Sequence, residues 1–132
     1  AKEFNLPVRM ASAELYAKYG AAGRRKEYAK AGVLGPDVLI HDMAMPNDPA
    51  KVADYYDNIL RSLKPGTVTE LYLHPAVESQ ELRNITATHA IRNADYQWLV
   101  SPHTRQLIQK LGIKLIGYRP IRELQRRLRA GK

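Results

Sequence analysis

Two patterns of apolar residues alternate along the chain. In the first, apolar residues recur every three or four positions, in segments that begin at a capping residue and end near a glycine. This spacing predicts helices over residues 12–19, 24–31, 49–64, 79–94, 101–111 and from Pro120 to the end. The longest stripe includes Val52, Tyr56 and Leu60, and it follows Asp48-Pro49, a cap-then-proline start.

The second pattern consists of short continuous apolar runs between turn residues. These runs predict strands over residues 6–10, 37–41, 67–74 and 113–117. Continuous apolar runs are typical of parallel strands that helices cover on both faces. The fold class is therefore α/β, with parallel strands alternating with helices in one domain over residues 1–132. About half of a (β/α) barrel and an open three-layer sheet are both compatible with four such units.

Composition removes several classes of function. The chain has no cysteine, so any metal must be held by His, Asp or Glu. No apolar run is long enough to span a bilayer, and the first residues do not resemble a signal peptide, so we expect a cytoplasmic protein without a membrane partner. The sequence also contains no glycine-rich phosphate loop and no serine-hydrolase elbow.

The net charge of +8 first suggests a polyanion as partner. From Arg119 onward, however, the sequence contains six cations and one carboxylate, Glu123, so most of the excess charge lies in one terminal helix. A short basic helix at a chain end is more often a solvated face than a reader of nucleic acid. The charge distribution therefore argues against nucleic acid as the partner.

The carboxyl ends of parallel strands are where ligands and catalytic groups gather. Four positions meet this criterion: Arg9, His41-Asp42, His74 and Tyr118-Arg119. His74 stands out because Pro75 follows it, and a rigid backbone suits a ligand that must point at a fixed atom. A histidine that merely satisfies its ring nitrogens at a strand end is an equally good interpretation from position alone.

The other polar candidates favour structural roles. Glu70, buried in the same strand, should pair with an arginine. His41-Asp42 precedes an irregular segment and is better explained as loop. His89 and His103 fall in helices without a partner at i+4, so we expect solvated or capping roles. Helical spacing makes four aromatic residues part of the core before it makes them a binding surface: Tyr55, Tyr56, Tyr96 and Trp98.

Several longer motifs carry a family resemblance. The specific one is Pro-Gly-x-x-Thr-Glu-Leu-x-x-His-Pro within residues 63–75. It is supported by Leu-Pro-Val-Arg at 6–9, Gly-Pro-Asp at 35–37, and the segments 91–102 and 111–119. With these motifs the chain resembles the C-terminal half of the YdjC-like carbohydrate deacetylases.

The resemblance implies a distorted (β/α) barrel that binds a divalent metal ion, Mg²⁺ or Zn²⁺, through one Asp and two His, and that removes N-acetyl groups from amino sugars. The histidine of the His-Pro motif is a metal ligand in that family and corresponds to His74. The motifs that carry the other ligands and the acid/base Asp are absent from residues 1–132. We therefore expect the fragment alone to be inactive, with the metal bound only when the other half is present.

The sequence alone does not decide whether this chain is part of an enzyme. In the deacetylase hypothesis, His74 binds the metal, Arg9 contacts an N-acetylated sugar or oligosaccharide, and an N-terminal half or a second copy completes the barrel. The alternative is a non-enzymatic module that binds a sugar or a polyanion.

Overall fold

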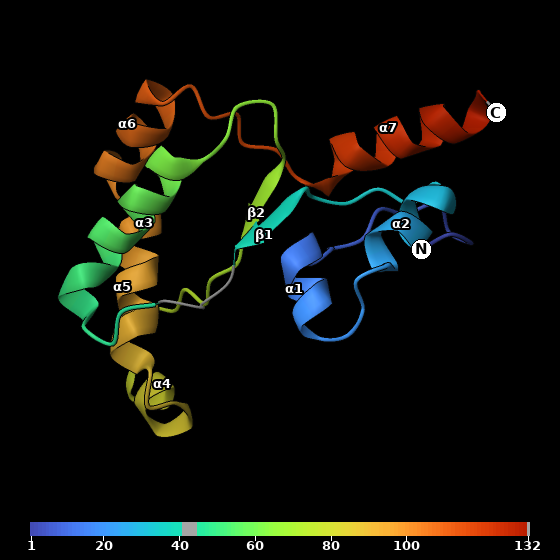
Figure 1. Ribbon diagram of the computed structural model, residues 1–132. Helices are drawn as coiled ribbons and strands as arrows, with labels where there is room; N and C mark the ends of the chain where they lie inside the picture. The colour runs from blue at the N-terminus through green and yellow to red at the C-terminus, as the bar shows by residue number, and fades with distance from the viewer. Residues whose placement is uncertain (41–44, 132) are drawn as a thin grey trace. The chain divides into compact units, whose positions relative to one another are not determined.

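The structure is a computed structural model that describes residues 1–40 and 45–131 (Figure 1). Its elements, in chain order, are α1 Ala13–Lys18, α2 Arg24–Lys30, β1 Val38–Ile40, the 3-10 helix η1 Pro49–Lys51, α3 Val52–Ser62, β2 Thr69–Leu71, α4 Gln80–Ile85, α5 His89–Val100, α6 Pro102–Lys110 and α7 Tyr118–Ala130. Helices and parallel strands therefore alternate in the first half of the chain, as the α/β prediction requires. His41 and Asp42 lie outside the described residues.

The described residues form two compact units. The first contains Ala1–Ile40, Gly66–Leu71 and the chain from Leu115 onward. The second contains the described residues up to Pro65 together with Tyr72–Lys114. The polar side chains discussed below fall into one unit or the other.

The sheet of the first unit consists of β1 and β2, which pair in parallel with Leu39 opposite Glu70 (Figure 1). Asp37 extends this pairing: its backbone N–H donates to the Val68 carbonyl, and its carboxylate accepts from the Val68 N–H, both at 2.8 Å. The sheet is open, and no barrel closes within the residues that the structure describes.

Two of the four predicted strands do not form. Residues 6–10 are irregular, and the Val8 N–H donates to the Leu34 carbonyl at 2.9 Å. Residues 113–117 form neither helix nor strand, and Leu115 is 74% exposed. A strand exists only through its partner, and within the described chain neither segment has a strand beside it.

The helix predictions were confirmed where capping residues marked them. The Ser12 hydroxyl accepts from the Leu15 N–H at the start of α1, Asp48 caps η1, and Ser101 caps α6. The single helix predicted over 79–94 is wrong. It is broken after Ile85, where Thr86 takes an extended conformation, and α5 then continues through Asp95 to Val100. Asp95 therefore lies inside a helix and not in a turn.

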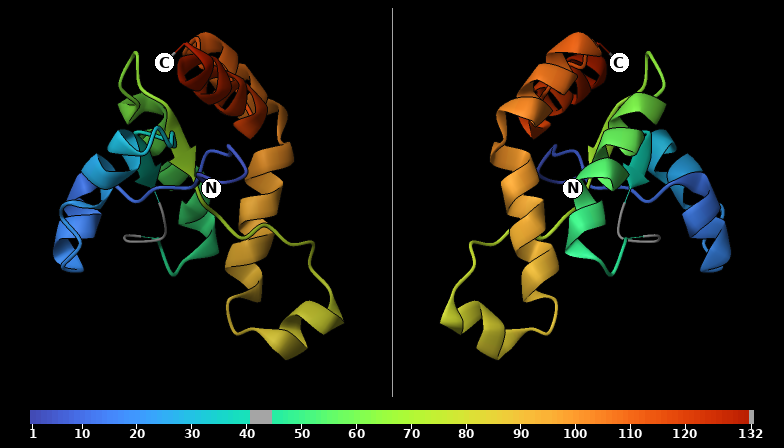
Figure 2. Two further views of the ribbon diagram at one scale, coloured as in Figure 1. Left: turned by 90° about the vertical axis from the view of Figure 1, so that its right-hand side faces the viewer. Right: turned by 90° about the vertical axis from the view of Figure 1, so that its left-hand side faces the viewer.

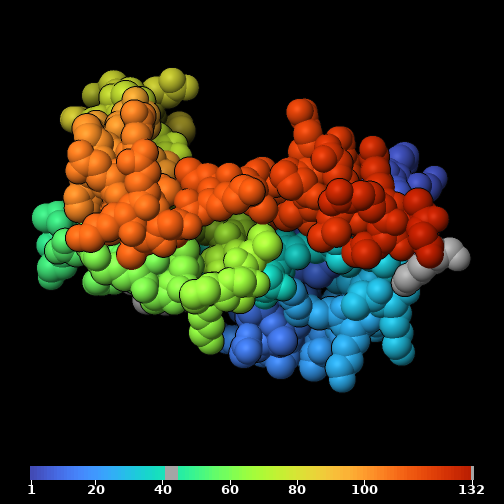
Figure 3. All heavy atoms as spheres, turned by 90° about the horizontal axis from the view of Figure 1, so that it is seen from above, coloured from blue at the N-terminus to red at the C-terminus, as the bar shows by residue number. Residues whose placement is uncertain are grey.

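The core of the first unit combines apolar and polar residues. Met10, Val33 and Pro36 are buried, and Gly35 fits against them because a Cβ there would lie 2.3 Å from the Val8 carbonyl oxygen. Gln125 of α7 is completely buried and accepts from the Leu34 N–H at 2.7 Å. The terminal helix, red in Figure 3, is thus held by an internal amide, although its Arg119, Arg126 and Arg127 are exposed.

The second unit is a cluster of helices in which α3, α5 and α6 pack on one another. Its core consists of Val52, Tyr56, Leu60, Leu82, Trp98 and Leu107. The stripe predicted for α3 is confirmed, since its members at 52, 56 and 60 are all buried. Among the aromatic residues, Tyr56 and Trp98 are core residues as predicted, and their ring centroids lie 4.6 Å apart. No helix in the described ranges is both long and apolar enough to cross a bilayer.

Candidate functional site

His74 lies three residues beyond the end of β2, so the prediction that it ends the strand was wrong. It belongs to a segment without helix or strand, residues 72–79, that leads from β2 to α4. Figure 2 shows this segment passing α5 before the chain enters α4. The His74 side chain is exposed, and its ring meets the Tyr72 ring edge-on at a centroid distance of 4.8 Å.

Three alternate backbone amides tie this segment to α5. The N–H of His74 donates to Asp95 Oδ2 at 3.2 Å, and that of Ala76 donates to the Arg92 carbonyl at 3.0 Å. The N–H of Glu78 donates to Asn93 Oδ1 at 3.2 Å. Because alternate amides of an extended chain point to the same side, one edge of the segment faces α5. The amides of residues 74, 76 and 78 are therefore bonded to α5 and not to a strand.

Asp95 is the most deeply buried of these anchors, at 2% exposed. Its second oxygen, Oδ1, accepts from the Tyr56 hydroxyl at 2.8 Å. Burial, together with the nearby carboxylate, raises the pKa of Tyr56 and keeps its hydroxyl protonated as a donor. A carboxylate out of water is costly unless it is hydrogen-bonded, and here both of its oxygens have donors.

A second hydrogen bond joins α3 and α5, and here the donor lies on α5 and the acceptor on α3. The Trp98 indole N–H of α5 donates to Asp57 Oδ1 of α3 at 3.0 Å, and His103 Nε2 lies 2.6 Å from Asp57 Oδ2. Burial alone would raise the pKa of Asp57, but the hydrogen bonds from Trp98 and His103 outweigh it and the pKa is lowered. The solvated or capping role predicted for His103 is thus incomplete, since its exposed ring also pairs with a half-buried carboxylate.

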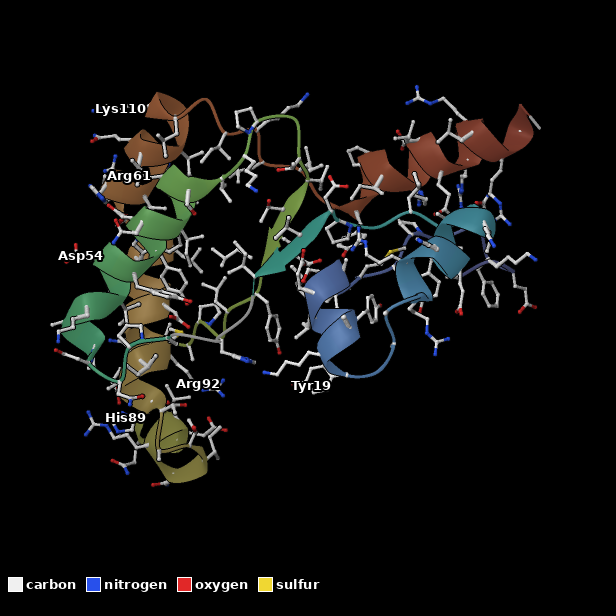
Figure 4. All side chains as sticks on the ribbon, in the orientation of Figure 1. Tyr19, Asp54, Arg61, His89, Arg92 and Lys110 are labelled. Atoms are coloured by element: carbon white, nitrogen blue, oxygen red, sulfur yellow. The ribbon has the colours of Figure 1, made fainter. Side chains whose placement is uncertain are left out.

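His89 has a comparable partner at the start of α5. Its Nδ1 lies 3.3 Å from Glu78 Oε2, and Arg83 donates to the other oxygen of Glu78 at 2.6 Å. The hydrogen bonds from Arg83 and His89 lower the pKa of Glu78. Figure 4 shows His89 and Arg92 along the first turn of α5. These groups hold the segment after His74 and the start of α5 together.

Arg9 belongs to the other compact unit. Its guanidinium contacts Glu70, with Nε donating to Oε1 at 2.6 Å, and the Tyr118 hydroxyl donates to Oε2 at 2.5 Å. The predicted pairing of Glu70 with an arginine is confirmed. Burial and the bond to Glu70 raise the pKa of Tyr118 to about 12. A sugar-binding role for Arg9 stays a prediction.

The metal site that the resemblance implies is not complete within the described residues. A catalytic divalent metal normally takes three protein ligands and keeps one position open. Within residues 1–40 and 45–131, no three His, Asp or Glu side chains come together in a way that could hold a metal ion. His74 has an exposed imidazole and a backbone bonded to Asp95, which suit one ligand, but no set of three ligands forms around it in the part of the chain that the structure describes.

Sequence reasoning missed Asp95 and Asp57. The helix predicted over residues 79–94 ends before Asp95 and so leaves this residue outside it. A usable signal was present: Asp95 lies four positions after Ile91 and three before Trp98, hence on their face of a helix. A carboxylate on an apolar face needs a donor, and Tyr56 and His74 supply one each.

Comparison with known sequences supports the resemblance. A sequence model of the family described as YdjC-like protein matches residues 1–110. A curated relative, the carbohydrate deacetylase of Thermoanaerobacter pseudethanolicus (strain ATCC 33223 / 39E), is 31% identical over 118 residues, which are 89% of this chain and 42% of the relative. The chain therefore spans less than half the length of that relative. The stretch that the family model matches contains both His74 and Asp95.

Proposed function

The chain belongs to the YdjC-like protein family, and from this membership we propose that it is part of a carbohydrate deacetylase that hydrolyses N-acetyl groups of amino sugars. The proposal depends on one observation above the others: the family match includes the His-Pro segment, with the exposed His74 imidazole on a backbone anchored to α5. In the reaction, water adds to the acetamide carbonyl carbon, the C–N bond breaks, acetate leaves and the nitrogen gains a proton to become the free amine.

His74 is the residue we assign to this site. We propose that it is one ligand of the divalent metal that the family resemblance implies. The described residues bring together no set of three ligands, so the missing ligands and the base would come from residues outside the described ranges or from beyond this chain. The 132-residue chain alone is therefore expected to release no acetate. Arg9 is retained as a candidate contact for the sugar.

The test measures acetate release from N-acetylated oligosaccharides by the longest natural polypeptide that contains this chain. His74→Ala should reduce turnover roughly 100-fold or more, since losing even an outer partner of a metal ligand typically costs 10–100-fold. The matched control is His103→Ala, which removes another exposed imidazole, that of α6. Because His103 pairs with Asp57, turnover is compared per folded protein, and it should stay close to that of the unmodified protein.

Two results would contradict the proposal. Undiminished acetate release by His74→Ala would remove His74 from the site. No acetate release from any N-acetylated sugar, by a polypeptide that folds and includes the rest of the family's length, would remove the deacetylase assignment. A non-enzymatic sugar- or polyanion-binding module would then be the better explanation.

A further inference from the structure

Asp95 accepts a hydrogen bond from the backbone of His74, and this contact leads to a further inference. We propose that Asp95 is the positioning residue for His74: its buried carboxylate fixes the backbone of His74, and so the direction in which the imidazole leaves the chain. The inference rests on the proposed function, in which His74 is a metal ligand. The contact between Asp95 and His74 can nevertheless be tested without measuring acetate release.

The geometry makes Asp95 a two-sided clamp. Oδ2 accepts from the His74 N–H at 3.2 Å, and Oδ1 accepts from the Tyr56 hydroxyl at 2.8 Å. Tyr56 is 1% exposed and packs against Trp98, so the hydroxyl that orients the carboxylate is itself fixed by the core. The core therefore fixes Tyr56, Tyr56 orients the Asp95 carboxylate, and the carboxylate holds the backbone of His74.

The neighbouring anchors do not perform the same task. Asn93 and the Arg92 carbonyl hold Glu78 and Ala76, which lie further along the segment. Asp95 alone among these three acceptors contacts the residue that carries the functional side chain. A ligand must be held within a few tenths of an ångström of its working position, and that requires a rigid support directly behind it.

A carboxylate suits this place because it must accept two hydrogen bonds at once. Both of its oxygens accept, so it can take one donor from Tyr56 and one from His74 at the same time. The amide of Asp95→Asn can still accept from the His74 N–H through its oxygen, with its NH₂ group donating to the Tyr56 oxygen. Asparagine is thus the conservative replacement that should keep the clamp, whereas alanine removes it.

The experiment measures amide hydrogen exchange, residue by residue, in the 132-residue chain and its variants. In Asp95→Ala the exchange rate of the His74 amide should rise roughly tenfold, the loss expected for one hydrogen bond. The Ala76 amide, bonded to the Arg92 carbonyl, is the internal reference and should change much less. Asp95→Asn should restore most of the protection at His74.

The opposite results overturn the inference. Equal losses of protection at His74, at Ala76 and through α5 would mean that Asp95 only stabilises the helix cluster. Unchanged exchange at His74 in Asp95→Ala would mean that the contact does not hold its backbone. Where Asp95→Ala does not fold, Asp95→Asn and Tyr56→Phe provide the test: Tyr56→Phe should raise exchange at His74 more than at Ala76, and equal changes would again contradict the clamp.

Activity separates this inference from the proposed function. In the acetate assay with the longer polypeptide, Asp95→Ala should reduce turnover roughly 10- to 100-fold, as other outer partners of ligands do, and Asp95→Asn should recover part of it. If His74→Ala abolishes turnover while Asp95→Ala does not alter it, the positioning role fails and the function stands. If His74→Ala has no effect, the function fails, and the exchange result still decides whether Asp95 holds His74.

Discussion

At the scale of single residues, the contacts of Asp57 predict how the free energy of unfolding depends on pH. Its pKa is lowered in the folded protein, because the Trp98 and His103 hydrogen bonds outweigh the opposing effect of burial. A carboxylate of this kind stabilises the fold above its unfolded pKa of about 4, and the contribution is lost as the pH falls through the lower folded value. Asp57→Asn should therefore reduce the free energy of unfolding at neutral pH, and the difference from the unmodified chain should shrink below pH ~4.

Urea denaturation at a series of pH values measures this difference. Asp54→Asn is the control, because Asp54 lies on the exposed side of the same helix (Figure 4) and the substitution is identical. Its effect should be small at every pH. A constant difference between Asp57→Asn and the unmodified chain from neutral pH to pH 3 would contradict the prediction.

The same residue scale shows where sequence reasoning reached its limit. Glu70 was expected to pair with an arginine because a carboxylate in a strand needs a cation, and Arg9 is that partner. Tyr118 was singled out by position, but its hydroxyl bond to Glu70 was not foreseen. Residue type therefore predicts that a buried polar group has a partner. The identity of the partner depends on contacts between distant parts of the chain, which a periodicity does not encode.

At the scale of elements, the way α7 is held leads to a second prediction about stability. Its Gln125 is completely buried, with Oε1 accepting from the Leu34 N–H and Nε2 donating to Asn5 Oδ1 at 3.0 Å. Gln125→Ala leaves the half-buried Leu34 N–H without its acceptor and removes one of the two donors to Asn5 Oδ1, since Arg129 also donates to that oxygen. Removing one partner of such a hydrogen bond typically costs about 1–3 kcal/mol. The free energy of unfolding from urea titration should fall by that amount.

The control for α7 is Gln109→Ala, the same substitution at an exposed position of α6. Its effect should stay within about 0.5 kcal/mol. Equal stability changes for the two variants would mean that the buried amide of Gln125 is not what holds α7.

Elements also differ in how well the sequence predicts them. Helices were found where a cap and an i, i+4 stripe coincide, as at Asp48 with Val52 and Tyr56, because their hydrogen bonds are local. The break at Thr86 was missed because it requires only one extended residue within a periodic pattern. Residues 6–10 and 113–117 have strand composition but no strand beside them, and strand pairing is a property of two segments, not of one.

At the scale of the whole molecule, exposed pairing surface leads to the last prediction. The sheet has two strands, so within the described chain each has one edge without a strand neighbour, and such edges are templates for pairing. An isolated two-stranded sheet is marginally stable in water. On α7, Leu124 and Leu128 are 44% and 52% exposed. Together these features favour association between copies of this chain.

We therefore expect light scattering after size-exclusion chromatography to give a mass above 15.0 kDa for the chain on its own, rising with concentration. Leu128→Glu should shift the population toward monomer because it places a charge on the exposed apolar side of α7. Ala130→Glu adds the same charge at an exposed neighbouring position without removing apolar surface, and it should change the mass far less. A monomer at all concentrations, or equal effects of the two glutamates, would rule out association through this helix.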